Sequence, residues 1–241
     1  MAYLQLTTSC NMTCAHCCFA ATNKGDNMTR ETFLRALEFA EAHGELVTLG
    51  GGEPTVHPEF FEFLDKTMER YQRGRIELPP LVVTNGKQVK KARKLLEYVA
   101  EERPVHVDLS LDDYHDPIHP EIEEAFKAHE RERRMNSRFG SSPREGSAGI
   151  RTVENIQPVG RAAEPARGIP ITVVGAPCCC EDLLVDPFGN VFSCGCKIHL
   201  LGNIYEEESF LDDFDREQAH YGGGLPDREH MRLPVAQAAA A

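Results

Sequence analysis

The sequence lacks any long run of apolar residues, and even its longest run, such as the one at 171–174, covers only a few positions. A membrane-spanning helix needs about 20 consecutive apolar residues, so we expect no membrane segment. The N-terminus also lacks the basic and apolar regions of a signal peptide. Together these absences predict a cytoplasmic protein.

The chain also lacks an excess of positive charge. Its 26 basic and 38 acidic residues give a formal net charge of −12. Proteins bind duplex nucleic acid through Lys and Arg side chains that neutralise phosphates, so we expect no nucleic-acid partner. With 241 residues, of which 41% are hydrophobic and 27% charged, the chain has the composition of an ordinary globular protein and can bury a core without crosslinks.

Cysteine is too scarce for a disulfide-rich scaffold, which has more than about 8% of this residue, and the nine cysteines are an odd number. Structural disulfides are also rare in the cytosol. The cysteines nevertheless form two groups: Cys10, Cys14, Cys17 and Cys18, then Cys178, Cys179, Cys180, Cys194 and Cys196. Clustered thiols in a reducing compartment indicate metal binding or catalysis.

Hydrophobic periodicity and turn residues predict alternating strands and helices. We expect strands at 3–8, 46–49, 81–83 and 105–111, and helices at 30–43, 58–71, 87–100 and 121–134. Segment 138–149 has the composition of a loop, and further strands are expected at 150–159 and 171–174. This alternation predicts an α/β fold with a parallel sheet. The polar and glycine-rich motifs follow the strands, at the edge where such folds hold their sites.

The first cysteine group spells C-x3-C-x2-C, with Cys10, Cys14 and Cys17 in a loop after the first strand. Soft thiolate ligands suit an iron–sulfur cluster or zinc. Three ligands would leave one iron of a 4Fe–4S cluster open, whereas a zinc site usually closes with a fourth Cys or His. His16 and Cys18 are nearby candidates for such a fourth ligand, so spacing alone leaves both metals possible.

A second motif, Gly51-Gly52-Glu53-Pro54, ends the second strand. Glycines let the backbone come close to a ligand. Exposed carbonyl oxygens at the end of a strand could accept hydrogen bonds from an ammonium group, although the motif alone also fits a tight turn into the next helix.

Together the two motifs resemble those of the radical S-adenosylmethionine (SAM) superfamily. The resemblance implies that Cys10, Cys14 and Cys17 hold a 4Fe–4S cluster whose open iron is chelated by SAM. It also implies that Gly51, Gly52, Glu53 and Pro54 contact the methionine amino group. The implied fold is a partial (β/α)6 barrel, and the implied activity is reductive cleavage of SAM to a 5′-deoxyadenosyl radical.

Weaker matches extend the resemblance to other strand ends. Asn85 after the third predicted strand, and Ser110 and Asp112 after the fourth, lie where the family contacts the SAM ribose and carboxylate. Asn155 and Arg161 resemble the segment at the fifth strand. Many members have an aromatic residue before the third cysteine, near the adenine. Here that residue is His16, which could stack in the same place.

The second cysteine group surrounds a predicted β-hairpin at 183–196, with Pro187 and Gly189 in its turn. The spacing Gly189-x4-Cys194 resembles the start of the SPASM and twitch extensions of radical SAM enzymes, which implies an auxiliary 4Fe–4S cluster. We expect Cys180, Cys194 and Cys196 as ligands, with Cys178 or Cys179 as the fourth. A full SPASM region has further cysteines, which are missing after Cys196, and zinc or no metal are the alternatives here.

These observations predict a radical SAM barrel at 1–175, a small cysteine-bearing hairpin cap at 176–205, and an acidic helix with a disordered tail at 206–241. The cap resembles those of enzymes that modify ribosomally made peptides. The expected partners are therefore a peptide or small-molecule substrate and an electron donor such as flavodoxin or ferredoxin. A radical SAM enzyme acting on a metabolite or protein side chain, or a non-catalytic iron–sulfur or zinc protein, is the alternative.

Overall fold

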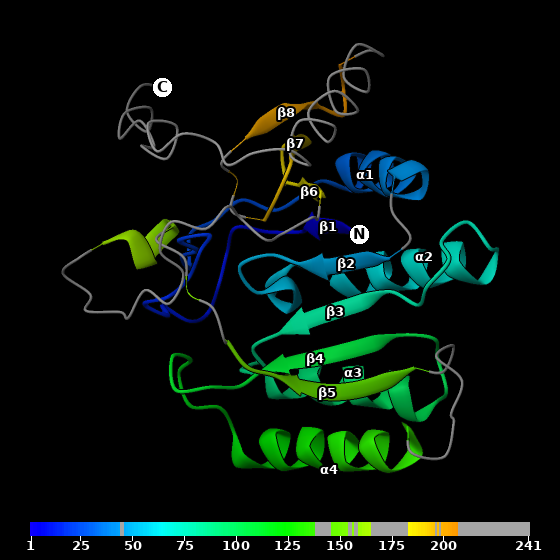
Figure 1. The fold of residues 1–241 in the computed structure, drawn as a ribbon, viewed down its shortest axis with the longest axis vertical. Helices are drawn as coiled ribbons and strands as arrows, with labels where there is room; N and C mark the ends of the chain where they lie inside the picture. The colour runs from blue at the N-terminus through cyan, green and yellow to red at the C-terminus, as the bar shows by residue number, and fades with distance from the viewer. Residues whose placement is uncertain are drawn as a thin grey trace, which may run out of the picture.

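The computed structural model describes residues 1–43, 46–137, 146–153, 156, 159–164, 183–195, 197 and 199–206. Within this part of the chain, strands and helices alternate as predicted (Figure 1). The strands are β1 (Ala2–Gln5), β2 (Val47–Gly50), β3 (Leu81–Thr84), β4 (His106–Ser110), β5 (Ser147–Arg151), β6 (Leu183–Val185), β7 (Asn190–Phe192) and β8 (Leu200–Asn203). The α-helices are α1 (Arg30–His43), α2 (Phe60–Gln72), α3 (Val89–Ala100) and α4 (Pro120–Ser137), and the 3-10 helices are η1 (Pro54–Val56) and η2 (Gly160–Ala163).

All eight strands form one open sheet in the order β5-β4-β3-β2-β1-β6-β7-β8. Strands β5 to β1 and β6 pair in parallel, and β7 and β8 add antiparallel strands at the end. The α/β class and its mostly parallel sheet are therefore confirmed. The predicted hairpin forms as β6 and β7, and it extends the main sheet because β6 pairs with β1, for example Leu4 with Val185.

The core lies between one face of the sheet and the helices. Side chains alternate across a strand, so β1 buries Ala2 and Leu4 against helix residues such as Phe33 while Tyr3 and Gln5 lie on the opposite face. Rings from α1 and α2 stack in this layer, with the centroids of Phe33 and Phe63 4.0 Å apart. Thr29 caps the start of helix α1, since its hydroxyl accepts a hydrogen bond from the Thr32 N–H at 3.1 Å.

The fifth strand differs from its prediction. The loop expected at 138–149 gives way to β5 at Ser147, and β5 ends at Arg151 instead of continuing to 159. Small residues such as Gly149 have low strand propensity, but pairing with β4 in register, Asp108 with Gly149, overrides it. The sixth strand predicted at 171–174 lies outside the described residues, as does the tail from 207 on. The boundaries at 175 and 205 remain predictions.

No helix among the described residues is long and apolar enough to cross a membrane.

Candidate cofactor site at the carboxyl edge of the sheet

The first cysteine loop follows β1 and lies beside the carboxyl ends of the parallel strands, at the arrowheads in Figure 1. Backbone hydrogen bonds close this loop on its returning segment, with Cys10 N–H donating to Thr22 O at 2.7 Å. Cys10 and Cys14 are buried and Cys17 is partly exposed. The structure thus brings the three predicted thiol ligands together in one small loop.

The electrostatics of these thiols favour a cationic ligand. Burial raises the pKa of Cys10 to about 11, although a hydrogen bond from the Met12 N–H opposes the shift. Negative charge on Glu53, Cys14 and Cys17 adds to the rise. Burial also raises the pKa of Cys14, and Cys17 contributes to that rise. Neighbouring thiolates that repel one another are stabilised when a metal binds them, so this soft donor set fits a 4Fe–4S cluster.

Arg161 is distant in the sequence from the cysteine loop, yet it makes hydrogen bonds to the backbone of that loop. Its side chain is buried, its Nε donates to Cys14 O at 2.9 Å, and its guanidinium also donates to Ala21 O. The Arg161 N–H donates to Cys17 O at 3.0 Å. The preceding Gly160 has φ +58, and a Cβ there would lie 2.2 Å from Cys18 O. Arg161 was predicted to contact the cofactor; in this structure its side chain and its N–H donate to the loop that carries the thiols.

The glycine motif after β2 directs its N–H groups toward β1. Gly51 N–H donates to the hydroxyl of Tyr3 at 2.9 Å, Gly52 N–H to Thr7 O at 2.7 Å, and Glu53 N–H to Ser9 O at 2.8 Å. Side chains do not fit here, since a Cβ on Gly52 would lie 2.3 Å from Ser9 O. With all three N–H groups used, the loop offers carbonyl oxygens, which suit an ammonium group better than an anion.

Glu53 of that motif joins two strand ends through its side chain. Its side chain is 1% exposed. Its carboxylate accepts hydrogen bonds from the Thr55 N–H and hydroxyl, from the Thr84 hydroxyl at 2.7 Å, and from the Asn85 N–H at 2.7 Å. Burial raises the pKa of Glu53, and these hydrogen bonds oppose the rise. Glu53 therefore ties the end of β2 to the end of β3.

Asn85 connects that strand end to the cysteines. Its Nδ2 lies 2.8 Å from Asn11 Oδ1 and 3.7 Å from Cys10 Sγ. The following Gly86 has φ +67, and a Cβ there would meet Leu109 at 2.6 Å. Asn85 is thus directed at the cysteine loop.

Ser110 ends β4 and pairs in register with Arg151 of β5. Because Leu109 is buried in the core beside the helices, Ser110 and Arg151 lie on the opposite face of the sheet. Burial raises the pKa of Tyr3, and the Arg151 guanidinium partly offsets that rise. The exposed Arg151 thus places a positive charge near the glycine loop, and it was not among the predicted site residues. Its position in register with Ser110 could be recognised only once β5 had been placed.

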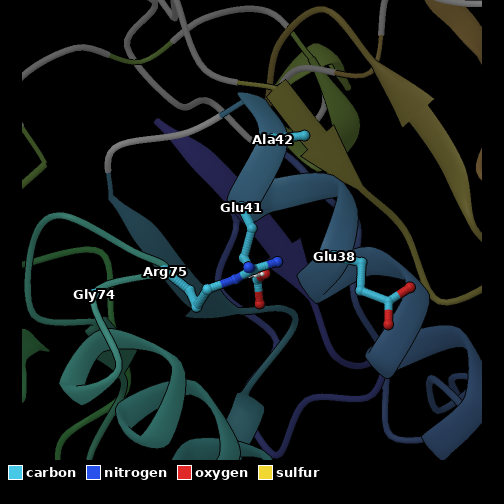
Figure 2. Close-up of a pocket in the computed structure, with 5 residues that line it drawn as sticks. All are labelled: Glu38, Glu41, Ala42, Gly74 and Arg75. Carbon is cyan, nitrogen blue, oxygen red and sulfur yellow. Dashed lines mark hydrogen bonds and ion pairs between the residues drawn. The ribbon is translucent and has the colours of Figure 1, made fainter.

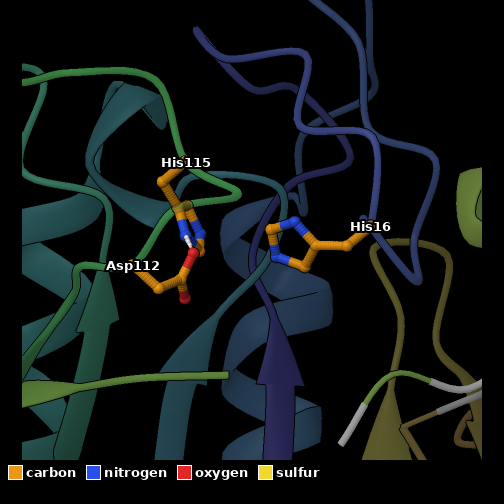
Figure 3. Close-up of side chains that lie close together, drawn as sticks. All are labelled: His16, Asp112 and His115. Atoms are coloured by element: carbon orange, nitrogen blue, oxygen red, sulfur yellow. Dashed lines mark hydrogen bonds and ion pairs between the residues drawn. The ribbon is translucent and has the colours of Figure 1, made fainter. Parts of the chain in front are cut away.

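Asp112 and His16 approach each other above the strand ends, together with His115 (Figure 3). Asp112 Oδ1 lies 2.8 Å from His115 Nδ1 and accepts a hydrogen bond from the Tyr114 N–H, and Asp112 Oδ2 accepts one from the Val153 N–H. Burial alone would raise the pKa of Asp112, but the hydrogen bonds from His115, Tyr114 and Val153 lower it. The ring centroids of His16 and His115 are 4.7 Å apart.

Burial lowers the pKa of His16, and the nearby His115 and Arg161 lower it further. Within the described chain, His16 Nδ1 is buried and has no hydrogen-bond partner. The ligand atoms of His16, Asp112 and His115 all lie within 4.8 Å of one another, a set that could also hold a divalent metal. His16 lies between Cys14 and Cys17 and Asp112 follows β4, so the trio adjoins the cysteine loop. His115 was missed because only the turn after β4 brings it there.

Only Cys194 of the second cysteine group lies among the described residues. It is buried just after β7, and its carbonyl oxygen accepts a hydrogen bond from the Lys197 N–H at 3.1 Å. Lys197 Nζ lies 6.0 Å from the centroid of Phe19, the residue that follows Cys18. The hairpin and the first cysteine loop are therefore neighbours. The other predicted ligands, Cys178, Cys180 and Cys196, and the predicted SAM contact Asn155 lie outside the described residues.

A hollow of about 370 Å³ lies elsewhere, among Glu38, Glu41 and Ala42 of α1 and Gly74 and Arg75 after α2 (Figure 2). Glu41 is nearly buried there and forms ion pairs with Arg70 at 3.0 Å and Arg75 at 3.2 Å. These residues end the helices at the amino edge of the sheet, away from the cysteines. This hollow is lined by an ion-pair network and is not part of the candidate site.

Comparison with known proteins decides the family. A model of the radical SAM superfamily matches residues 4–138, more than half of the chain. The chain belongs to the radical SAM superfamily. Members of this superfamily are enzymes, and membership implies a 4Fe–4S cluster and SAM as cofactors.

Two groups of curated relatives match part of this radical SAM chain. The mycofactocin maturase MftC of Mycobacterium ulcerans is 36% identical over 63 residues, which is 25% of this chain and 17% of that protein. The putative peptide biosynthesis protein YydG of Bacillus subtilis is 27% identical over 121 residues, which is 48% of this chain and 36% of that protein. The matches thus span well under half the length of these relatives.

Solved structures share the fold. BtrN in complex with AdoMet and 2-DOIA has a TM-score of 0.57 at 15% identity, covering 93% of this chain and 89% of BtrN. Streptococcus suis SuiB bound to its precursor peptide SuiA has a TM-score of 0.54 at 14% identity, covering 92% of this chain and 65% of SuiB. At these identities the likeness concerns the fold alone.

Proposed function

We propose that this protein is a radical SAM enzyme that reductively cleaves SAM and abstracts hydrogen from a ribosomally made peptide. One observation carries the first part: the loop of Cys10, Cys14 and Cys17 lies beside a glycine loop whose N–H groups are all used. Soft thiolates can bind three irons of a cluster, while the remaining carbonyl oxygens suit the amino group of SAM.

The chain's own residues would hold and orient SAM. Carbonyl oxygens of the Gly51–Gly52 loop would accept hydrogen bonds from the amino group, and Ser110 and Arg151 lie on a neighbouring part of the same face for the carboxylate. Asp112 and His16 would contact the ribose and the adenine. When bound, the cluster supplies the electron that cleaves SAM to the 5′-deoxyadenosyl radical. The protein supplies binding, orientation and shielding from water.

A peptide substrate is supported by the relatives, since MftC and YydG are named for peptide maturation or biosynthesis and SuiB was solved with a precursor peptide. BtrN was solved with the small molecule 2-DOIA, and its fold match favours a small metabolite as the second candidate. We further propose that Cys194, with Cys178, Cys180 and Cys196, binds an auxiliary 4Fe–4S cluster, and that a cytoplasmic flavodoxin or ferredoxin supplies electrons.

The central test is SAM cleavage. The full chain would be reconstituted with iron and sulfide without oxygen, reduced with dithionite and supplied with SAM. We expect 5′-deoxyadenosine, measured by liquid chromatography and mass spectrometry. A protein that carries its cluster and forms no 5′-deoxyadenosine would contradict the proposal. Adding short peptides encoded beside the gene tests the substrate class, because a modified peptide shows a mass change or incorporation of substrate hydrogen into 5′-deoxyadenosine.

A further inference from the structure

Three hydrogen bonds hold the N–H groups of Gly51, Gly52 and Glu53. Of these three, the one to Tyr3 of β1 is made to a side chain. Its hydroxyl oxygen accepts the Gly51 N–H at 2.9 Å, whereas Gly52 and Glu53 donate to backbone carbonyl oxygens of Thr7 and Ser9. A substitution can therefore remove the Gly51 hydrogen bond without altering any backbone group.

The ring of Tyr3 also lies directly against the loop. A Cβ built on Gly50 would lie 1.9 Å from the Tyr3 hydroxyl oxygen and 2.3 Å from the ring carbon that bears it. The ring of Phe19 also packs against the Tyr3 ring, with their centroids 5.8 Å apart. The Gly50–Gly51 peptide is thus held at both ends, because the Tyr3 hydroxyl accepts the Gly51 N–H and the Leu6 N–H donates to Gly50 O at 2.9 Å.

The Tyr3 hydroxyl stays neutral at physiological pH. Burial raises its pKa above the ordinary value for tyrosine, and negative charge on Cys18 adds to the rise. A neutral hydroxyl accepts the Gly51 hydrogen bond without bringing an anion next to the thiols.

We propose that Tyr3 is a positioning residue for the SAM amino group: it orients the carbonyl oxygens of the glycine loop through the Gly51 N–H. This inference rests on the proposed function, because it assigns a part of the same site. Tyr3→Phe keeps the ring and removes only the acceptor, which leaves the Gly51 N–H without a partner and its peptide plane less fixed.

The test measures binding to the reconstituted full-length protein by titration calorimetry, with two probes. SAM carries the amino group, and 5′-methylthioadenosine lacks the whole amino-acid part. Losing one hydrogen bond of this kind lowers the affinity about fivefold. We expect Tyr3→Phe to weaken SAM binding about fivefold and to leave 5′-methylthioadenosine binding unchanged.

Tyr98→Phe is the matched control, because Tyr98 lies on α3 in the helix layer, where Arg103 stacks on its ring. It should leave the affinity for both probes unchanged. Equal weakening of both probes by Tyr3→Phe, or no weakening of SAM binding, would overturn the inference. If the wild-type protein binds SAM and never cleaves it, the proposed function fails while the two-probe comparison still decides the role of Tyr3.

Discussion

The first cysteine loop and the C-terminal hairpin are built in opposite ways. Residues far apart in the sequence hold the loop: Asn85 lies next to Cys10, and Arg161 bonds to the Cys14 carbonyl oxygen. The turn of the hairpin is held locally, because Asp186 accepts hydrogen bonds from the N–H groups of Phe188 and Asn190. The shape of the cysteine loop therefore depends on distant residues, whereas the hairpin turn is fixed by its own residues even though β6 pairs with β1.

This difference has a consequence for metal binding. Buried thiols of the loop face a site assembled from four strand ends, which suits a cluster with an open coordination position. Cys194 follows β7 of the hairpin, so a metal site there would use other thiols than the first loop does. The comparison predicts that the two cysteine groups are separable.

The largest effect should come from changing Cys10, Cys14 and Cys17 together to Ala. A 4Fe–4S cluster is held by Cys thiolates, so we expect the loss of about four irons per chain and of all SAM cleavage. Iron analysis and 5′-deoxyadenosine formation are the measurements. SAM cleavage that persists in the triple variant would disprove the assignment of this loop.

A smaller effect is expected from replacing Cys194 and Cys196 by Ala. If the hairpin holds a second cluster, iron should fall from about eight to about four per chain. SAM cleavage without substrate should continue, because the first site does not use the hairpin, while substrate turnover is lost. Metal analysis of the wild type provides the contrast: four irons with stoichiometric zinc would rule out the auxiliary cluster, and four irons alone would indicate a hairpin without metal.

Arg161→Met tests whether the loop depends on distant residues. The change leaves the carbonyl oxygens of Cys14 and Ala21 without their charged donor, which costs about 2–4 kcal/mol in the free energy of unfolding. Urea unfolding without oxygen would measure it. Arg73→Met is the matched control, since Arg73 is exposed and pairs only with Glu69 on the surface of α2, and it should change stability by less than about 0.5 kcal/mol. Equal stability of the two variants would show that the loop is held by local contacts.

The sequence was sufficient to predict those parts of the site that follow strands with clear periodicity. The cysteine loop, the glycine loop, Asn85 and Ser110 all lie at strand ends, as expected. The start of β5 was missed because Ser147, Ala148 and Gly149 resemble a loop until β4 pairs with them. Arg151, His115 and Tyr3 carry no motif of their own, and only tertiary pairing brings them to the site.

The same limit applies to roles within a motif. Spacing placed Glu53 and Arg161 at the cofactor, but it could not distinguish a ligand contact from a hydrogen bond that supports the loops. The structure adds the supporting hydrogen bonds: Glu53 accepts four of them, from Thr55, Thr84 and Asn85.

The smallest effect is expected from Cys18→Ala, and it sharpens the comparison between loop and hairpin. Cys18 follows Cys17 directly, yet its surroundings differ from those of the other three thiols. Cys18 is exposed, and its charge acts on Tyr3 and on Lys197 of the hairpin segment. Cys10, by contrast, responds to Glu53, Cys14 and Cys17.

We therefore expect Cys18→Ala to keep the iron of the first site and its SAM cleavage, because three thiolates and SAM complete that cluster. A closed structural site would instead need a fourth protein ligand, and Cys18, which follows Cys17 directly in the sequence, is a thiol that could supply it. Iron content and 5′-deoxyadenosine formation distinguish the two cases, with Cys17→Ala as the positive control for ligand loss. If Cys18→Ala removes the first cluster as completely as Cys17→Ala does, the three-ligand site is wrong and the open coordination position that SAM needs does not exist.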